Sequence, residues 1–454
     1  MYLNRVEKIL LFLDNKSSRY HFLRVLIENA KYILKNKFLI EFLKNMSMIF
    51  IFKVLTQVIF TVMSIVAARE LGPSDMGNIA IINNISNFLM IPMVMGINIS
   101  MNKYLPVLDE KEQKEMISST IISNIPLAII LVTVYTLFSN KICSTFHITN
   151  SFMISSLILC VLISYNSISE SFLRGQKKFK QICYLKLAFT LTFAIILCVQ
   201  FYFMGSRDIS SYLSTNYIAY AVFIIGALLL TGVRHLKFNR KMVASVYSYG
   251  FINMLGAALN IFLTSCDLFF VKSFCSSVDT GLYSVYMGNA KSLLGLLFFE
   301  IFGVVFLPAI ASMDKQKVYK NIIKYSVPTF IAVFCAGVLW STLSIFLYGN
   351  KYEYNILFVL LVSASLAVTF IYQLFCFTIA MEGTAEARFT LITGALPLPM
   401  AIFLQFILTK YWGITGTFVA VLIVNIILLF TLLLSVRWYR AKKKQNTKEG
   451  RISC

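Results

Sequence analysis

Twelve long apolar runs occupy most of this chain, and they restrict its fold more than any other feature. Each run has roughly the 20 residues that a helix needs to cross a hydrocarbon core of about 30 Å. Hydrophobic residues make up 58% of the sequence, which is more than a soluble protein of 454 residues can bury. The sequence therefore predicts an all-α integral membrane protein with about 12 transmembrane helices. The expected spans are 46–68, 79–100, 116–138, 151–173, 182–204, 213–232, 243–264, 283–310, 325–348, 354–380, 389–409 and 413–436.

The distribution of basic residues predicts how these spans are oriented. The net charge is +21, and 33 of the 41 Lys and Arg residues lie before the first span, after the last span or in connections that follow an even-numbered span. The opposite connections hold only six. Because cytoplasmic connections are enriched in Lys and Arg, both termini are predicted to be cytoplasmic. This asymmetry accounts for the basic charge, so no nucleic-acid partner is expected.

The remaining composition argues against a metal site or an enzyme. The nine cysteines are scattered without a CxxC pair, and only three histidines occur. These cysteines fit small apolar side chains in a membrane protein better than metal ligands or a disulfide framework. The connections between spans are too short for a soluble catalytic domain. We therefore expect no catalytic residue, no metal and no cofactor, with coupling to a gradient of H+ or Na+ left open.

An internal repeat predicts how the spans are grouped. The turn Asp75–Gly77 recurs about 204 residues later as Asp279–Gly281, and each copy separates two apolar runs. Leu105-Pro106 recurs in the same way as Leu307-Pro308. Six spans per copy is an even number, so both copies start on the same side of the membrane and form parallel repeats. The repeat predicts two pseudo-symmetric six-helix bundles with a substrate site between them.

The repeated turns also make local predictions. Gly72-Pro73 cannot continue a helix, so the first span should end there. Asp75 and Asp279 are placed to cap the helices that follow, where a carboxylate suits the positive end. The predicted divisions are a cytoplasmic amphipathic segment at 1–45, a first bundle at 46–232, a cytoplasmic linker at 233–242, a second bundle at 243–436 and a basic cytoplasmic tail at 437–454.

Several short motifs carry a resemblance to a known family. The motifs are Ala68-Arg69-Glu70-Leu71-Gly72-Pro73 with Gly77, Asp267-Leu268-Phe269-Phe270-Val271 followed by Gly281-Leu282-Tyr283-Ser284-Val285 and Lys291, Arg174-Gly175 with Phe179-Lys180, and Trp412-Gly413-Ile414-Thr415-Gly416-Thr417. Together they cover roughly residues 45–437. In this order, they resemble the polysaccharide-lipid flippases of the multidrug/oligosaccharidyl-lipid/polysaccharide (MOP) superfamily.

The resemblance implies a function and its partners. Such a protein uses alternating access between two bundles to turn undecaprenyl-pyrophosphate-linked oligosaccharide repeat units from the inner to the outer leaflet. Its product feeds O-antigen, capsule or exopolysaccharide assembly, with a polysaccharide polymerase and chain-length machinery as further partners. The expected location is the bacterial cytoplasmic (inner) membrane, and the working unit is expected to be a monomer surrounded by membrane lipids.

Four cations are candidate substrate-binding residues, because a diphosphate needs cationic donors. Lys53 and Lys291 each lie about two turns inside a span, where a charge costs roughly 2.5–3.5 kcal/mol to insert. They should face a wet interior, or else snorkel to the nearer interface. Arg69 ends the first span, and its alternative partners are Glu70 and lipid headgroups. Arg174 ends the fourth span, where it could instead serve only as a topology signal.

Amides form a second group of candidates. Asn83, Asn87 and Asn98 follow one another at spacings of four and eleven residues, so they should share one face of the second span. Because an amide stripe is costly in lipid, this face should meet another helix or line the cavity. The proposed substrate-binding amides of both halves are Asn83, Asn87, Asn253, Asn260 and Asn289.

Three acids lie within the spans, and one of them could carry a coupling proton. They are Glu170, Asp267 and Glu300. Glu300 has no evident partner in its own span, which makes it the better candidate. Asp267 lies five residues before Lys272, so a local pair or a helix cap is the simpler interpretation for it.

Three other functions compete with the flippase. A multidrug antiporter of the same superfamily would favour acids in its cavity, whereas this chain has lysines within spans. A flippase for the lipid-linked peptidoglycan precursor shares the pyrophosphate chemistry but typically has more arginines in the first bundle and often further helices. A polysaccharide polymerase or ligase would need a sizeable outer loop with catalytic Arg or His, and the outer connections are short and nearly uncharged.

Overall fold

A computed structural model describes most of the chain. The described residues are 37–146, 148–233, 235–302, 315–380 and 384–452. The chain divides into two compact units, Met1–Leu55 and Thr56–Cys454. The amphipathic segment predicted at 1–45 lies almost entirely outside the described residues, and so does Leu307-Pro308.

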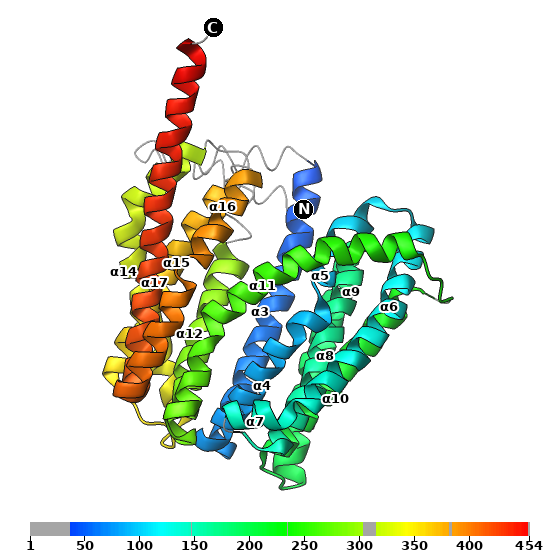
Figure 1. Cartoon of the computed structure of the whole chain (residues 1–454). Coiled ribbons are helices and arrows are strands. Elements are labelled where there is room, and N and C mark those ends of the chain that lie inside the picture. The colour runs from blue at the N-terminus through cyan, green and yellow to red at the C-terminus, as the bar shows by residue number, and fades with distance from the viewer. Residues whose placement is uncertain (1–36, 147, 234, 303–314, 381–383, 453–454) are drawn as a thin grey trace, which may run out of the picture. The chain divides into compact units, whose positions relative to one another are not determined.

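Every regular element among the described residues is helical (Figure 1). The helices are α3 (Lys37–Leu71), α4 (Pro73–Val94), α5 (Ile97–Tyr104), α6 (Glu110–Leu137), α7 (Ser139–Phe146), α8 (Asn150–Gly175), α9 (Phe179–Cys198), α10 (Ile209–Thr231), α11 (Arg240–Phe274), α12 (Ser277–Leu294), α14 (Lys315–Tyr348), α15 (Ile356–Ala380), α16 (Thr384–Ala395) and α17 (Leu398–Ile452). A 3-10 turn covers Leu105–Val107, and π-helical turns cover Val199–Phe203 and Gly295–Phe302.

The described helices agree with the predicted membrane protein. Ten of them are long and apolar enough to cross a bilayer. The run predicted at 283–310 is described only as far as Phe302, through α12 and the π-helical turn after it. The run predicted at 389–409 begins in α16 and continues in α17, which also contains the run predicted at 413–436. Between these runs, Gly413 breaks the helical geometry of α17 with φ 59° and ψ −141°. About twelve spans are therefore consistent with the structure, and the chain is a multi-pass membrane protein.

The second predicted span needs a correction. Instead of one helix over 79–100, α4 ends at Val94 and α5 starts at Ile97. Met95 and Gly96 between them are both left-handed, with φ 45° and 67°. This bend lets α11 approach, because a methyl group on Gly96 would lie 2.1 Å from the Gly250 carbonyl oxygen. The chain then leaves the helix at Leu105-Pro106, as predicted.

Each half of the second unit has its own apolar core. We call α4–α10, with α3 from Thr56 on, the N-terminal half, and α11–α17 the C-terminal half. The N-terminal half buries Phe193 and Phe201 completely. The C-terminal half packs Tyr283 and Tyr286 against Phe418, with ring centroids 4.9 and 6.1 Å apart. Each core packs the helices of its own half against one another, and these helices carry the polar side chains described below.

The two copies of the repeated turn meet at the boundary between the halves, where α4 packs on α12. A methyl group on Gly77 would lie 2.5 Å from the Ser277 carbonyl oxygen, and one on Gly281 would lie 1.7 Å from the Pro73 carbonyl oxygen. Small residues at helix interfaces allow such backbone approach in membranes. The repeated glycines therefore join the two halves.

Of the two predicted helix caps, Asp279 is confirmed and Asp75 is wrong. Ser276 and Asp279 form a capping box at the start of α12, in which each side chain accepts from the other residue's backbone N–H. Asp75 lies in the first turn of α4, but the cap residue there is Gly72 and makes no side-chain cap bond. The carboxylate of Asp75 is thus near the positive helix end without being its cap.

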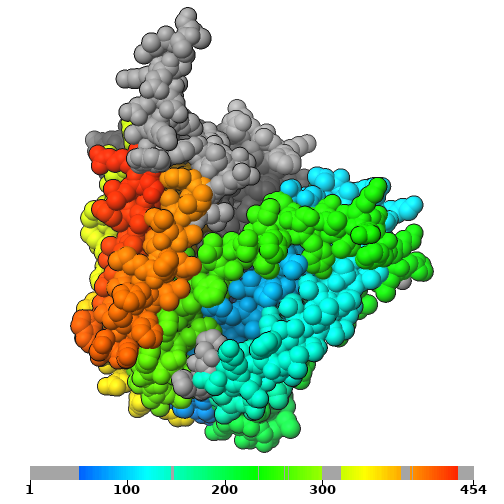
Figure 2. Space-filling view, in the orientation of Figure 1, coloured from blue at the N-terminus to red at the C-terminus, as the bar shows by residue number. Residues whose placement is uncertain are grey.

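Helix α11 lies across the N-terminal half. Figure 2 shows it (green) over α4 and α5 (blue), which it contacts together with α6. The Ser100 hydroxyl donates to the Val246 carbonyl over 2.8 Å, and the Ser123 hydroxyl donates to Tyr247 over 3.3 Å. The Lys103 ammonium lies 3.6 Å from the centroid of the Tyr249 ring. The halves are therefore joined by α11 as well as by the repeated glycines.

Candidate functional site

A cavity of about 190 Å³ lies between the two halves. The N-terminal half contributes α3, α4 and α10, and the C-terminal half contributes α12 and α14. All of its described lining residues are uncharged. They are Gln57, Phe60, Thr61, Ser64, Met76, Ile79, Ala80, Asn83, Tyr212, Ser284, Val285, Gly288, Asn289, Ser292, Trp340 and Tyr348. We call this space the central cavity.

Two predicted amides, Asn83 and Asn289, meet in the central cavity. Asn289 is only 8% exposed, and its Oδ1 accepts a bond of 3.1 Å from the Tyr348 hydroxyl. Its Nδ2 is buried and has no acceptor among the described residues. The indole Nε1 of Trp340 is likewise buried and has no acceptor among the described residues. The wall therefore holds two buried N–H donors whose bonds are not made within the described protein.

Three hydrogen bonds link the N-terminal half to the C-terminal half near the turn between α3 and α4. The Arg69 guanidinium donates to the Leu347 carbonyl over 2.6 Å. The Lys351 ammonium donates to the Glu70 carbonyl over 3.1 Å, and the Tyr352 hydroxyl donates to the Ala68 carbonyl over 3.3 Å. We call these three bonds the α3–α14 latch.

A second cavity, of about 250 Å³, lies within the N-terminal half. Helices α3, α8, α9 and α10 line it. Gln57 and Phe60 of α3 line both this space and the central cavity, so the two cavities are neighbours. Unlike the central cavity, it contains charge, supplied by Glu170 and Lys186. We call it the ionic cavity.

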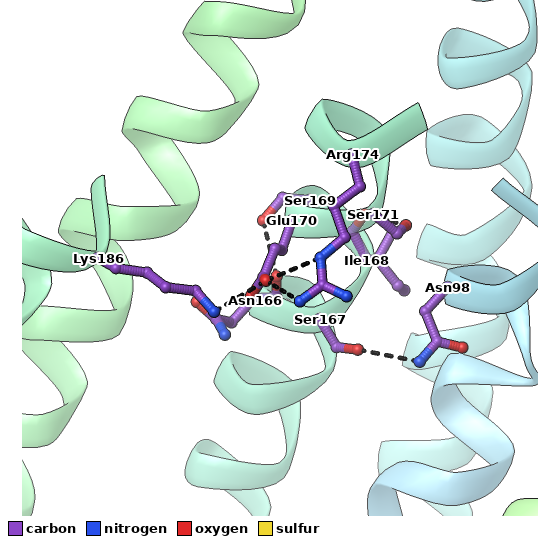
Figure 3. A network of polar contacts seen from close by, with 9 residues as sticks. All are labelled: Asn98, Asn166, Ser167, Ile168, Ser169, Glu170, Ser171, Arg174 and Lys186. Carbon is purple, nitrogen blue, oxygen red and sulfur yellow. Dashed lines mark hydrogen bonds and ion pairs between the residues drawn. The ribbon is translucent and has the colours of Figure 1, made fainter. Parts of the chain in front are cut away.

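Glu170 and Lys186 of the ionic cavity form one cluster with Arg174, which is not among the described lining residues of that cavity (Figure 3). A single oxygen of Glu170, Oε1, lies 2.5 Å from Arg174 Nη2 and 2.9 Å from Lys186 Nζ. The Glu170 side chain is 13% exposed, whereas Lys186 is 35% and Arg174 48% exposed. Two cations share one carboxylate, so the cluster carries one surplus positive charge that remains accessible to a ligand.

The loop after Arg174 is also basic. The Lys178 ammonium donates to the Leu230 carbonyl at the end of α10 over 2.6 Å. Partial burial and, to a smaller extent, the nearby charge of Lys114 lower the pKa of Lys178. This loop fixes the end of α8, which positions Arg174 beside Glu170.

A third polar group lies on α11 and α12. Asp267 is 3% exposed, and its Oδ2 accepts a bond of 2.5 Å from the Tyr283 hydroxyl. The Lys291 ammonium lies 3.9 Å from the same oxygen. The expected local pair of Asp267 with Lys272 is not formed, because the Lys272 ammonium donates to Asn78 Oδ1 and Ser277 Oγ. The side-chain partners of Asp267 come instead from the next helix, while its Oδ1 accepts from the Leu268 backbone N–H over 2.8 Å.

Comparison with known proteins decides the family. A family model described as polysaccharide biosynthesis protein matches residues 42–314, which is more than half of the chain. The chain belongs to the polysaccharide biosynthesis protein family. No curated protein matches its sequence.

Solved structures confirm the fold of this polysaccharide biosynthesis protein. An inward-facing multidrug resistance MATE family transporter of the MOP superfamily has a TM-score of 0.64 at 13% identity, covering 86% of this chain and 96% of the other. The lipid II flippase MurJ in an inward closed conformation also has a TM-score of 0.64, at 16% identity, covering 86% and 87%. The resemblance found in the motifs is thus confirmed at the level of family and fold.

The candidate cations of this polysaccharide biosynthesis protein do not line the central cavity in the part of the chain that the structure describes. Lys291 lies beside Asp267, and Arg69 is part of the latch. Of the two alternative partners named for Arg69, Glu70 is not the one found, because its carboxylate lies 2.9 Å from Arg207 and Arg69 donates to the Leu347 carbonyl. Lys53 belongs to the first compact unit.

The amides are also divided between locations. The predicted common face of Asn83, Asn87 and Asn98 is wrong at Asn98, because the bend at Gly96 moves it to α5. There its amide donates to Ser167 over 3.3 Å (Figure 3). Asn87 is outside the described lining of the central cavity, and Asn253 donates to the Tyr249 carbonyl of its own helix. The side chains of Asn260 and Glu300 lie outside the described residues.

Several residues of these cavities were not predicted. Lys186 was counted only as a cytoplasmic basic residue, although it lies 16 residues after Glu170 across the turn between α8 and α9. The spacing of four residues between Glu170 and Arg174 predicts an ion pair on one helix face, which is one of the two ion pairs in the cluster. Trp340 and Tyr348 in α14 had no signal, because an aromatic residue in an apolar run usually belongs to the core.

Proposed function

We propose that this protein carries undecaprenyl-pyrophosphate-linked oligosaccharides from the inner to the outer leaflet of a bacterial cytoplasmic membrane. The movement occurs by alternating access of the two halves and supplies surface polysaccharide assembly. Both termini lie in the cytoplasm, and one chain is the working unit. This role is transport without covalent chemistry, as expected for the family and fold found above.

One observation carries the proposal. An uncharged cavity lined by amides, hydroxyls and aromatic rings adjoins a second cavity, whose Glu170 and Lys186 form a cluster of surplus positive charge with Arg174. The substrate has the same division, because a diphosphate is attached to neutral sugars. The diphosphate needs charge-assisted bonds, which Lys186 and Arg174 would supply. The sugars need neutral polar groups, which the central cavity would supply. The lipid tail would remain in the bilayer.

The orientation follows from the basic residues. If the Lys- and Arg-rich connections are cytoplasmic, the α3–α14 latch lies at the outer ends of the halves. An intact latch then corresponds to a conformation closed toward the outside, in which substrate reaches the cavities from the cytoplasmic leaflet. Breaking the latch would be part of opening toward the outer leaflet.

Deleting the gene tests the proposal in cells. We expect loss of surface polysaccharide and accumulation of complete lipid-linked oligosaccharide, with restoration by the wild-type gene on a plasmid. Loss of cell-wall synthesis with intact surface polysaccharide would instead favour the peptidoglycan precursor. Normal polysaccharide and no accumulation, in a strain without a second such transporter, would contradict the proposal.

The latch gives a prediction about accessibility. A variant with Arg69→Ala, Lys351→Met and Tyr352→Phe loses all three bonds, each worth roughly 0.5–1.5 kcal/mol. We expect a cysteine placed in the central cavity by Ser64→Cys, in a chain otherwise free of cysteine, to react about tenfold faster with a membrane-impermeant maleimide added to intact cells. The same labelling with the latch intact is the control, and equal rates would show that the latch does not close the cavity.

We also propose Asp267 as the carboxylate that couples transport to an ion gradient. It is buried, and both a phenol and an ammonium reach the same oxygen. An intramembrane carboxylate in such a setting is a functional candidate by default.

The expected result for Asp267→Asn is transport that no longer responds to a gradient. In vesicles, an imposed H+ or Na+ gradient should accelerate the wild type several-fold and leave the variant at its rate without a gradient. Lys272→Met, which alters a neighbouring cation outside this group, should retain the acceleration. A variant that still responds to the gradient would remove Asp267 from the coupling mechanism.

A further inference from the structure

The central cavity has an incomplete set of hydrogen bonds in one part of its wall. Asn289 on α12 and Trp340 on α14 each hold one buried side-chain nitrogen, Nδ2 and Nε1, that donates to no acceptor among the described residues. A buried donor left unpaired destabilises the folded protein, so such groups are normally satisfied by water or a ligand. Both residues line the same cavity.

The hydrogen bond from Tyr348 sets the orientation of the Asn289 amide. The Tyr348 hydroxyl donates to one lone pair of Oδ1, and Nδ2 remains as a donor without an acceptor among the described residues. Trp340 can only donate, because its indole nitrogen has no lone pair to offer. The pair therefore presents two donors and selects a ligand with hydrogen-bond acceptors.

The absence of charged residues from the described lining selects among such ligands. The described lining has no cation, and an anion placed there would be desolvated without a counter-charge. It has no carboxylate either, so a cationic drug would gain no ion pair. Neutral oxygen atoms remain as the fitting acceptors. The rings of Phe60, Tyr212 and Trp340 add flat apolar surfaces.

We propose that Asn289 and Trp340 form a sugar-recognition subsite, in which Nδ2 of Asn289 and Nε1 of Trp340 donate to hydroxyl or ring oxygens of a neutral sugar residue. This inference rests on the proposed function and assigns the sugars, rather than the diphosphate, to this part of the central cavity. When the subsite is empty, water molecules accept from these donors, since the cavity has room for several of them. A site that must satisfy buried donors discriminates strongly against ligands without matching acceptors.

The test compares two lipids on purified protein in detergent. One is the lipid-linked oligosaccharide extracted from the producing cells, and the other is undecaprenyl diphosphate without sugar. Calorimetry gives Kd for each with the wild type, Asn289→Leu and Trp340→Phe. Leucine keeps the shape of asparagine, and phenylalanine keeps an aromatic ring, so each change mainly removes the donor. Asn216→Leu is the matched control, because this amide donates to the Tyr212 carbonyl within α10.

We expect each donor variant to weaken binding of the sugar-bearing lipid about tenfold, as for one lost bond to a buried group. Binding of the bare diphosphate lipid should stay unchanged, and the control should match the wild type for both lipids. Equal weakening for both lipids, or no weakening for either, would overturn the subsite. Failure of the wild type to bind either lipid would overturn the proposed function itself, and the subsite with it.

Intrinsic fluorescence supplies a second readout that does not depend on a variant's stability. With Trp412→Phe and Trp438→Phe, Trp340 is the remaining tryptophan of the sequence. The sugar-bearing lipid should shift its emission, whereas the bare lipid should not. An identical shift with both lipids would show that the tail or the diphosphate reaches Trp340, which contradicts the assignment.

Discussion

Replacing Lys186 with methionine is expected to lower transport by tenfold or more while the protein stays folded. The variant keeps the Glu170–Arg174 pair, so the carboxylate is not left unpaired. What it loses is the surplus positive charge of the cluster that Glu170, Arg174 and Lys186 form. A hydrogen bond to a charged group is worth about 1.5–3 kcal/mol, which corresponds to the expected loss of affinity for an anionic headgroup.

The cluster allows a charge-compensated control. Combining Lys186→Met with Glu170→Gln restores one net positive charge, carried by Arg174. If charge is the variable, this double variant should transport within a few-fold of the wild type. Lys180→Met removes an exposed cation from the same helix and should have little effect. A double variant as inactive as Lys186→Met alone would show that the geometry of Lys186, and not the charge of the cavity, is what matters.

Replacing Gly281 with alanine is expected to have the largest effect on stability. The added methyl group would lie 1.7 Å from the Pro73 carbonyl oxygen, which belongs to a helix start and cannot move aside like a flexible side chain. Forcing extra volume into a packed contact costs typically 1–3 kcal/mol. We expect a melting temperature several degrees lower in detergent and loss of transport, because the two halves are separated at their common boundary.

A matched glycine controls for helix propensity. Gly256 lies within α11 with no atom within 4 Å of an added methyl group, so Gly256→Ala should leave the melting temperature unchanged or raise it slightly. Gly77→Ala should resemble Gly281→Ala, since it meets the Ser277 carbonyl oxygen at 2.5 Å. Normal stability of both repeat variants would show that the repeated turns do not join the halves as described.

The parts of the fold that depend on local sequence were predictable. Gly72-Pro73 ends α3 because proline cannot continue a helix, and the long apolar runs give helices whatever their neighbours are. The repeat identified Gly77 and Gly281 as equivalent, although their mutual contact is visible only in three dimensions. The bend at Met95 was missed, because nothing in the residues around it requires a left-handed backbone until α11 packs against Gly96.

The candidate sites were predicted less well, because their residues come from different helices. Asn83 and Asn289 were found since an amide in an apolar run needs a polar neighbour, and both line the central cavity. The same reasoning placed Lys291 in the cavity, but a lysine is equally satisfied by a carboxylate on the next helix, and Asp267 provides one. Trp340 could not be identified, because an aromatic side chain gives no sign of whether its N–H has a partner.

Transbilayer movement in vesicles of pure lipid tests the central claim most directly. The purified protein is reconstituted with fluorescent undecaprenyl-diphosphate-linked oligosaccharide, and an impermeant quencher reports which leaflet holds the label. The account predicts transfer in vesicles that contain the wild type, at least tenfold slower transfer with Lys186→Met, and recovery with the added Glu170→Gln. No transfer above protein-free vesicles, in protein that binds the lipid and retains its melting temperature, would contradict it.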